Sequence, residues 1–358
     1  SVSADDFGEE LHSKLDGITS KTGKVIISDD EGNTHTFTKN PDGTFECKVS
    51  APANKGDTVS EEKPTLNYSI SCINVVDNSD KTETLSFSVS TEDELFVKEF
   101  TVSVEDGVGN PSTDKKSITT RIEKIAPELV TVEDAGRVKT EEIKKEENKE
   151  VPVNCIVDYD VGGGYLVISG QFDDKNSGLK QIEFVKTNMM TLDESKELLS
   201  GEQIKDGKFE YKFSSEMPGG ERAWIDIIVT DYAGNEATYS YTAEPEKLLD
   251  NKFGSGCNVI FDKTTPTIDL AIASEPDYIK EDQNWYKAFP EINVSLEDKN
   301  ISSGINKICW RVNKQGINYI KCESEKIIIS PDEYKDRIAK DGKIEIQAYC
   351  TDVAGHKS

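Results

Sequence analysis

The chain has 358 residues and a formal net charge of −26, with 35% hydrophobic and 31% charged residues. This length accommodates several domains of roughly 100–200 residues, whereas so polar a composition would supply one large core poorly. The negative field repels nucleic-acid phosphates and anionic lipid surfaces, and no apolar run approaches the roughly 20 residues of a membrane span. We therefore expect neither a nucleic-acid partner nor a membrane contact.

The first predicted domain covers residues 1–125 and is rich in β-structure. Residues 101–110 form a strand-like run that ends in a turn containing Asp106. Residues 118–125 form another such run, which stops just before Pro127. Proline fixes φ and removes a backbone donor, so it suits a junction where one strand ends and another begins.

The second predicted domain covers residues 126–263. Apolar residues alternate over 208–213, which places every second side chain on one face of a half-buried strand. The run 224–229 is more continuously apolar and predicts an inner strand. Residues 172–184 indicate a strand, a turn that includes Asp174, and a second strand.

The third predicted domain covers residues 264–358. Residues 291–296 and 343–348 alternate in the same way and predict strands. Residues 296–310 repeat the strand, turn and strand pattern, now with Asp298 in the turn. The chain ends soon after a final glycine turn where a last strand should follow, so this domain is either complete or lacks that strand.

Few segments indicate helix. Residues 330–340 open with a capping serine, a proline and acidic residues, which together favour a short helix. Residues 191–199 predict a similar short helix, and residues 6–15 predict one at the N-terminal end. The charge-dense run 139–150 predicts either a loop or an exposed helix.

A repeated turn organises the whole sequence. Strand-like runs end in Asp-x-(Ala/Val)-Gly-(Asn/His) or a close variant, with the aspartates at Asp106, Asp231 and Asp352. These positions are spaced 125 and 121 residues apart. Pro127 and Pro266 each follow a short strand-like run. The spacing predicts three units, with boundaries near 126 and 264.

The ordered set of a junction proline, an Asp…Ser-Gly turn and an Asp-x-Ala-Gly-Asn turn resembles the bacterial immunoglobulin-like domains. The resemblance covers the second and third domains well, and the first through residues 105–110 and Pro127. It implies an all-β fold of three tandem immunoglobulin-like β-sandwiches with short helical insertions, the first of them divergent. Such domains occur in tandem on secreted and surface proteins, where they space or present other modules.

The turn aspartates have two interpretations. The structural one is that Asp231 and Asp352 accept hydrogen bonds from the following backbone amides, while Gly234 and Gly355 supply a positive φ. The alternative is a calcium site, since carboxylate oxygens suit Ca²⁺ although the EF-hand spacing is absent. The metal-ligand candidates are Asp106, Asp231, Asp352, Asp174 and Asp298.

Seven cysteines are scattered without a CxxC pair, which fits either occasional disulfides in an oxidising compartment or buried thiols. Three disulfides are predicted as hypotheses, with Cys350 a rival partner in the first: Cys309 with Cys322, Cys155 with Cys257, and Cys47 with Cys72.

Catalytic signatures are missing from the sequence. It has three histidines with no zinc or acid–base spacing, and it lacks the nucleophile-elbow and phosphate-loop motifs. We therefore predict a protein that is not an enzyme. Trp310 and Trp224 are predicted in the core, whereas Trp285 and Tyr286 are the candidates for an exposed ligand-binding pair.

These observations favour a structural or adhesive stalk from a larger extracellular, cell-surface or secreted protein. Neither end shows a signal peptide, and both look like cuts through a longer chain. The expected partners are other domains of the same polypeptide. The alternatives are a module that binds a host glycan or protein, and an accessory region of an enzyme. No cofactor is expected apart from the calcium alternative.

Overall fold

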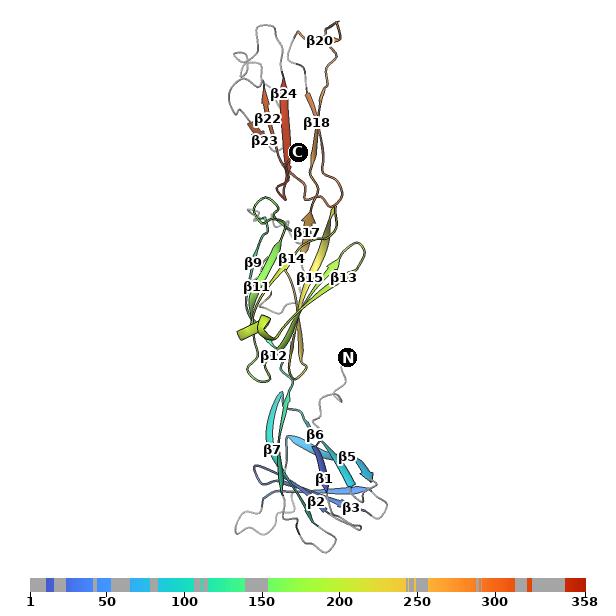
Figure 1. The fold of residues 1–358 in the computed structure, drawn as a ribbon, viewed down its shortest axis with the longest axis vertical. Helices are drawn as coiled ribbons and strands as arrows, with labels where there is room; N and C mark the ends of the chain where they lie inside the picture. The colour runs from blue at the N-terminus through green and yellow to red at the C-terminus, as the bar shows by residue number, and fades with distance from the viewer. Residues whose placement is uncertain are drawn as a thin grey trace. The chain divides into compact units, whose positions relative to one another are not determined.

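The computed structural model describes residues 11–15, 24–40, 44–52, 65–77, 83–105, 111, 115–138, 154–242, 244, 248, 257–287, 290, 292–312, 321–323 and 345–358. Over these residues the regular secondary structure consists of β-strands and one 3₁₀ segment, η2 (Gly201–Gly207). The strands form several separate sheets (Figure 1). Their buried apolar residues form three cores, which follow one another in the sequence. The predicted all-β architecture of tandem sandwiches is confirmed. The described residues contain no helix of the length and apolarity that a membrane crossing requires.

The chain divides into two compact units. One consists of Ser1–Ala126 with Tyr232–Asn235, and the other of Pro127–Asp231 with Glu236–Ser358. The first unit therefore ends at the predicted junction proline. The boundary predicted near 264 lies within the second unit, which nevertheless holds two separate cores, and it stays a prediction.

The first unit is a sandwich of two antiparallel sheets. One runs in the order β4 (Phe45–Ser50), β3 (Thr34–Lys39), β2 (Lys24–Asp29), β7 (Leu95–Glu105) and β8 (Lys116–Glu123). The other runs in the order β1 (Leu11–Leu15), β6 (Glu83–Thr91) and β5 (Tyr68–Asp77). Alternate residues of β2 point inward, and Phe37 meets Phe87 across the core at a ring separation of 4.8 Å.

The helix predicted over residues 6–15 is wrong for its described part. Leu11–Leu15 is strand β1, which pairs with β6 in antiparallel register. A segment of weak helical propensity gains ladder hydrogen bonds at a sheet edge, and this pairing overrides the local preference. Residues 6–10 lie outside the described residues, as do the predicted segments 139–150 and 330–340.

The middle sandwich belongs to the second unit. Its larger sheet runs in the order β10 (Asn154–Ile156), β17 (Asn258–Asp262), β15 (Gly220–Asp231), β12 (Leu179–Asn188) and β13 (Glu194–Ser200), with β16 (Glu236–Ser240) beside β15. Its smaller sheet runs in the order β14 (Lys208–Phe213), β11 (Leu166–Asp173) and β9 (Glu128–Ala135). β10 and β17 are parallel, whereas the other pairs are antiparallel. Phe172, Phe184 and Phe209 pack together in the core.

Two predictions in the middle sandwich are wrong. The segment 191–199 is not a helix, because a turn with Leu192 at φ 62° leads into β13, which pairs along β12. Trp224 is 41% exposed rather than buried. The strand β15 is an inner strand as predicted, but Ala223 and Ile225 occupy its inward positions, so Trp224 faces outward.

The third sandwich has a smaller described core. β18 (Thr267–Ile272) pairs with β21 (Ile292–Glu297), and a second sheet runs in the order β23 (Lys321–Glu323), β22 (Ile305–Val312) and β24 (Ile346–Asp352). A separate hairpin joins β19 (Tyr278–Lys280) to β20 (Gln283–Trp285). Trp310 is 1% exposed, which confirms its predicted place in the core. After β24 a single bridge pairs Lys357 with Thr351.

Candidate functional site

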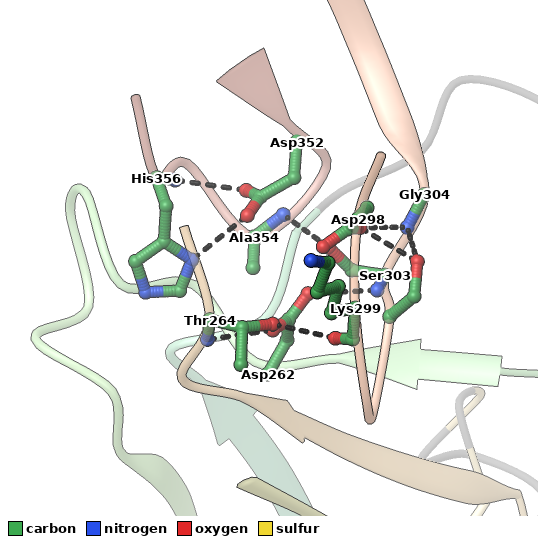
Figure 2. Close-up of polar contacts among 10 residues, drawn as sticks. Asp262, Thr264, Asp298, Lys299, Ser303, Gly304, Asp352, Ala354 and His356 are labelled. Atoms are coloured by element: carbon green, nitrogen blue, oxygen red, sulfur yellow. Dashed lines mark hydrogen bonds and ion pairs between the residues drawn. The ribbon is translucent and has the colours of Figure 1, made fainter. Parts of the chain in front are cut away.

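The most elaborate polar cluster lies where the middle sandwich meets the third. Asp262 ends β17 and is fully buried. Its Oδ1 accepts hydrogen bonds from the Thr264 amide at 2.9 Å and the Thr264 hydroxyl at 2.7 Å. Its Oδ2 accepts one from the Ser303 amide at 2.7 Å (Figure 2). One carboxylate therefore ties the last strand of the middle sandwich to a loop of the third.

Further contacts strengthen this junction. The Thr264 hydroxyl also lies 2.9 Å from the Lys299 carbonyl oxygen, and the Tyr159 amide donates to the Ala354 carbonyl at 2.9 Å. Gly355 has φ 102°, and a Cβ there would lie 2.6 Å from Cβ of Asp160. Only glycine allows so close an approach at this φ.

A second buried aspartate closes the turn after β24. The Asp352 carboxylate accepts a hydrogen bond from the His356 amide at 2.8 Å through Oδ1, and its Oδ2 lies 2.9 Å from the His356 Nδ1 (Figure 2). The pKa of Asp352 is raised, chiefly because the carboxyl is buried and to a smaller extent because of the negative charge of Asp262. The hydrogen bonds and charge of His356 act in the opposite direction. The Tyr159 ring lies 4.9 Å from the imidazole, and burial together with the Asp262 charge raises the pKa of Tyr159 to about 12.

Asp262, Asp352 and His356 are the residues of this cluster that could hold a metal ion. Each offers one ligand atom, and these atoms lie within 4.8 Å of one another. Calcium prefers six to eight oxygen ligands, whereas a nitrogen among three donors suits a transition metal better. Both oxygens of each carboxylate are already engaged in hydrogen bonds, so the cluster is held together as a turn and a junction.

The Asp352–His356 pair also resembles part of an acid–base dyad. Such a dyad needs a hydroxyl or thiol nucleophile beside the imidazole. The serine hydroxyls of the cluster bond elsewhere: Ser302 donates to Asp298 at 2.6 Å, and Ser303 accepts from the Ala354 amide at 3.1 Å. The side chains of Asp352, Ser302 and Ser303 therefore bond to backbone amides and to Asp298.

The predicted turn aspartates that the structure describes do not form one site, because they lie in different sandwiches. Asp174 and Asp231 have carboxylate oxygens within 4.8 Å of each other in the middle sandwich. Asp298 accepts from the Gly304 amide at 3.0 Å and lies in the third sandwich with Asp352. Asp106 lies outside the described residues.

The structural interpretation of these turns is confirmed for Asp352, which accepts the predicted amide bond. The glycines also behave as predicted, since Gly234 has φ 91° and Gly355 has φ 102°. Whether any of the aspartates binds calcium stays a prediction.

Two important aspartates were not predicted. The sequence did not single out Asp262, although its position just before the predicted boundary near 264 was the available signal. Asp29 begins a turn with Gly32 and Asn33 that has the same spacing as Asp352, Gly355 and His356. The Asp29 Oδ1 accepts from the Asn33 amide at 2.7 Å, and Gly32 has φ 85°.

The cysteines differ from one another in state. Cys309 is disulfide-bonded and lies directly opposite Cys322 in the register of β22 and β23, as the predicted pairing requires. Its predicted rival Cys350 is a buried thiol.

The other two predicted disulfides stay predictions. Cys155 and Cys257 are thiols in mutual contact. Cys47 is exposed on β4, whereas Cys72 lies on β5 of the other sheet.

The predicted ligand-binding aromatics lie on or beside the separate hairpin. Trp285 is 48% exposed and stands opposite Tyr278, which is 61% exposed. Tyr286 is half-buried. The pair that the hairpin exposes is therefore Tyr278 with Trp285, and their use as a binding site stays a prediction.

The fold and the junction define a class: an all-β protein of tandem sandwiches. No family model matches the chain, and no curated protein does. One similar solved structure is a tetra-tandem repeat in the extending region of a large adhesion protein, with 12% identity over 98% of this chain and 93% of that chain and a TM-score of 0.30. Another is trypsin-activated alpha-2-macroglobulin from Escherichia coli, with 9% identity over 98% of this chain and 22% of that chain and a TM-score of 0.22. At these scores neither similarity bears on function.

Proposed function

We propose that this chain is a non-catalytic structural region of a larger bacterial surface or secreted protein. Its immunoglobulin-like sandwiches would space or present other modules of the same polypeptide. Support comes from the serial arrangement of three cores and from the turn signatures shared along the chain. The acidic composition favours solubility and disfavours phosphate and anionic lipid partners.

The observation that carries this proposal is the bonded junction between the middle and third sandwiches. A spacer transmits position only if consecutive domains are fixed to each other, whereas domains on a mobile linker tumble independently. Asp262 bonds to the Ser303 amide, and Thr264 contacts the Lys299 carbonyl. These bonds fix the third sandwich to the middle one, which a mobile polar linker would not do.

Limited proteolysis with trypsin tests the junction, because Lys263 and Lys299 are trypsin sites within it. The Lys263 ammonium donates to the Ser215 carbonyl, which holds that segment against the middle sandwich. We expect the native chain to resist cleavage at both lysines. In Asp262→Ala, cleavage should be faster by about tenfold or more, since hydrogen bonds to charged groups contribute about 1.5–3 kcal/mol each.

Asp174→Ala is the matched control. Asp174 caps a turn within the middle sandwich, where its Oδ1 accepts from the Asn176 amide at 2.9 Å, and exposed Lys175 supplies a trypsin site beside it. This variant should speed cleavage at Lys175 and leave Lys263 protected. Rapid cleavage of the native chain after Lys263 would refute the fixed junction and remove the support for a spacer.

One observation favours a second function, recognition of a glycan or host protein. Tyr278 and Trp285 form a cross-strand pair that is more than two-fifths exposed at each residue. Aromatic faces bind sugars and protein partners by stacking and apolar contact.

A glycan array tests this second function directly. Specific binding that Trp285→Ala abolishes and Trp224→Ala preserves would support it, since Trp224 is an exposed tryptophan on another sandwich. An array with no specific ligand, together with no protein partner for the native chain, would reject it.

A further inference from the structure

The strands β10 and β17 bring two cysteines together in the middle sandwich. The strands are parallel, with Cys155 opposite Val259, and Cys257 lies two residues before Val259. A separation of two residues places Cys257 on the same face as Val259, and therefore on the same face as Cys155. Both cysteines are 2% exposed, and their thiols are hydrogen-bonded to each other.

Polar groups surround this thiol pair inside an otherwise apolar core. The Tyr241 hydroxyl lies 3.5 Å from the Cys155 sulfur and also bonds to Asp134. Arg137 donates to Asp134 at 3.0 Å through Nε. The hydrogen bond from Cys257 holds the pKa of Cys155 below its usual value, and the same bond raises the pKa of Cys257. Cys155 is thus the readier thiolate of the two.

We propose that Cys155 and Cys257 are a dithiol that is oxidised to a disulfide, and that this bond shields most of the middle sandwich from mechanical load. The oxidant is a disulfide of a small thiol or of a protein dithiol. The Cys155 thiolate attacks one oxidant sulfur and releases the other as a thiolate, giving a mixed disulfide. Cys257 then loses its proton and attacks the Cys155 sulfur, which releases the second oxidant thiolate. The cysteines lose two electrons and two protons, and the oxidant becomes two thiols. The exchange takes place during folding, once β10 and β17 have paired and brought the two thiols together, and before the core closes over the sulfurs.

The mechanical consequence follows from chain connectivity and rests on the proposed spacer function. Tension on a spacer enters the middle sandwich near Pro127 and leaves near Asp262. A bond between Cys155 and Cys257 carries that tension directly from one strand to its parallel neighbour. The roughly 100 residues between them are then bypassed, and they amount to about 340 Å of extended chain that tension cannot release.

Peptide mapping tests the covalent step, whatever the function of the chain. The whole chain is refolded in a buffer of reduced and oxidised glutathione, denatured, alkylated and digested without reduction. We expect a cross-linked peptide pair containing Cys155 and Cys257, while Cys350 is alkylated. Recovery of both Cys155 and Cys257 as alkylated thiols would overturn the proposal.

Single-molecule pulling of the whole chain tests the mechanical step. The oxidised native chain should release about 340 Å less than oxidised Cys155→Ser, in which the disulfide of Cys309 is unchanged. Equal release from these two oxidised chains would overturn the shielding. Failure of the spacer function would show instead as trypsin cleavage at the junction, with the cross-linked peptide still present.

Discussion

Buried aspartates close corresponding turns in the first and third sandwiches. Asp29 and Asp352 each accept a hydrogen bond from the amide four residues later, across a glycine with positive φ. The chemistry of such turns is local, which is why the sequence alone predicted the role of Asp352. Asp262 differs because its partner Ser303 is 41 residues away, and only the assembled junction shows that contact.

Asp29 should make the first sandwich sensitive to acid. Burial alone would raise its pKa, but hydrogen bonds from Asn33 and Tyr68 and the charge of Lys98 outweigh burial and lower it below 3.8. A lowered folded-state pKa contributes stability above the ordinary value, and this stability is lost as the pH falls through the folded value. Thermal unfolding followed between about pH 5 and pH 2 should therefore lose more stability in the native chain than in Asp29→Asn. Parallel losses in the two proteins would contradict this role.

Removal of the Asp29 side chain should be costly. Asp29→Ala leaves the Tyr68 hydroxyl without its bond of 2.8 Å and Lys98 without a buried partner at 3.5 Å. Lys98 keeps its 2.7 Å ion pair with Glu31, so the cost comes chiefly from the lost hydrogen bonds to the Asp29 carboxylate, each of about 1.5–3 kcal/mol, and we expect a loss of at least that size in urea unfolding. Asp30→Ala is the control, because Asp30 is an exposed partner of the same lysine and should cost under about 1 kcal/mol.

Calcium should leave the turn at Asp352 and the junction at Asp262 unchanged. The Asp352 and Asp262 oxygens are satisfied by amide, hydroxyl and imidazole groups, so no unbonded oxygen set is prepared for a hard cation. We expect equal melting temperatures in millimolar calcium and in chelator. A rise in calcium that Asp352→Asn abolishes would instead establish the metal site.

At the scale of elements, a strand could be predicted in full only where the sequence shows which side chains face the core and which face outward. Alternation identified β14 and β21 correctly, because period two is visible in the residues themselves. The apolar run in β15 is nearly continuous, so it does not show which side chains point inward. Trp224 was therefore wrongly predicted on the inward face. The segment that becomes β13 carries helix-favouring Glu, Lys and Leu residues, and its pairing with β12 is a tertiary effect that local propensity does not contain.

Gly220 should be essential to the pairing of β15 with β17. It has φ 83°, and a Cβ there would lie 1.9 Å from the Phe261 carbonyl oxygen. Gly201 also has a positive φ, of 56°, but a Cβ there would meet nothing within 4 Å. Gly201→Ala should cost about 1–2 kcal/mol of backbone strain, and Gly220→Ala should cost at least about 2 kcal/mol more. Urea unfolding measures both, and equal costs would show that the strands accommodate the added methyl group.

At the scale of the whole molecule, the repeat of turn signatures predicted three units, and the structure shows three cores. The predicted junction at Pro127 coincides with the division between the compact units. The contacts that fix the second junction were not predictable, because they join Asp262 to a loop whose fold depends on the rest of the third sandwich.

Small-angle X-ray scattering of the whole chain tests the central claim, a serial spacer, most directly. A single compact domain of 358 residues would have a radius of gyration of about 21 Å. Serial sandwiches with a fixed second junction should give a clearly larger value that Asp174→Ala leaves unchanged. A radius of gyration near 21 Å would contradict the account.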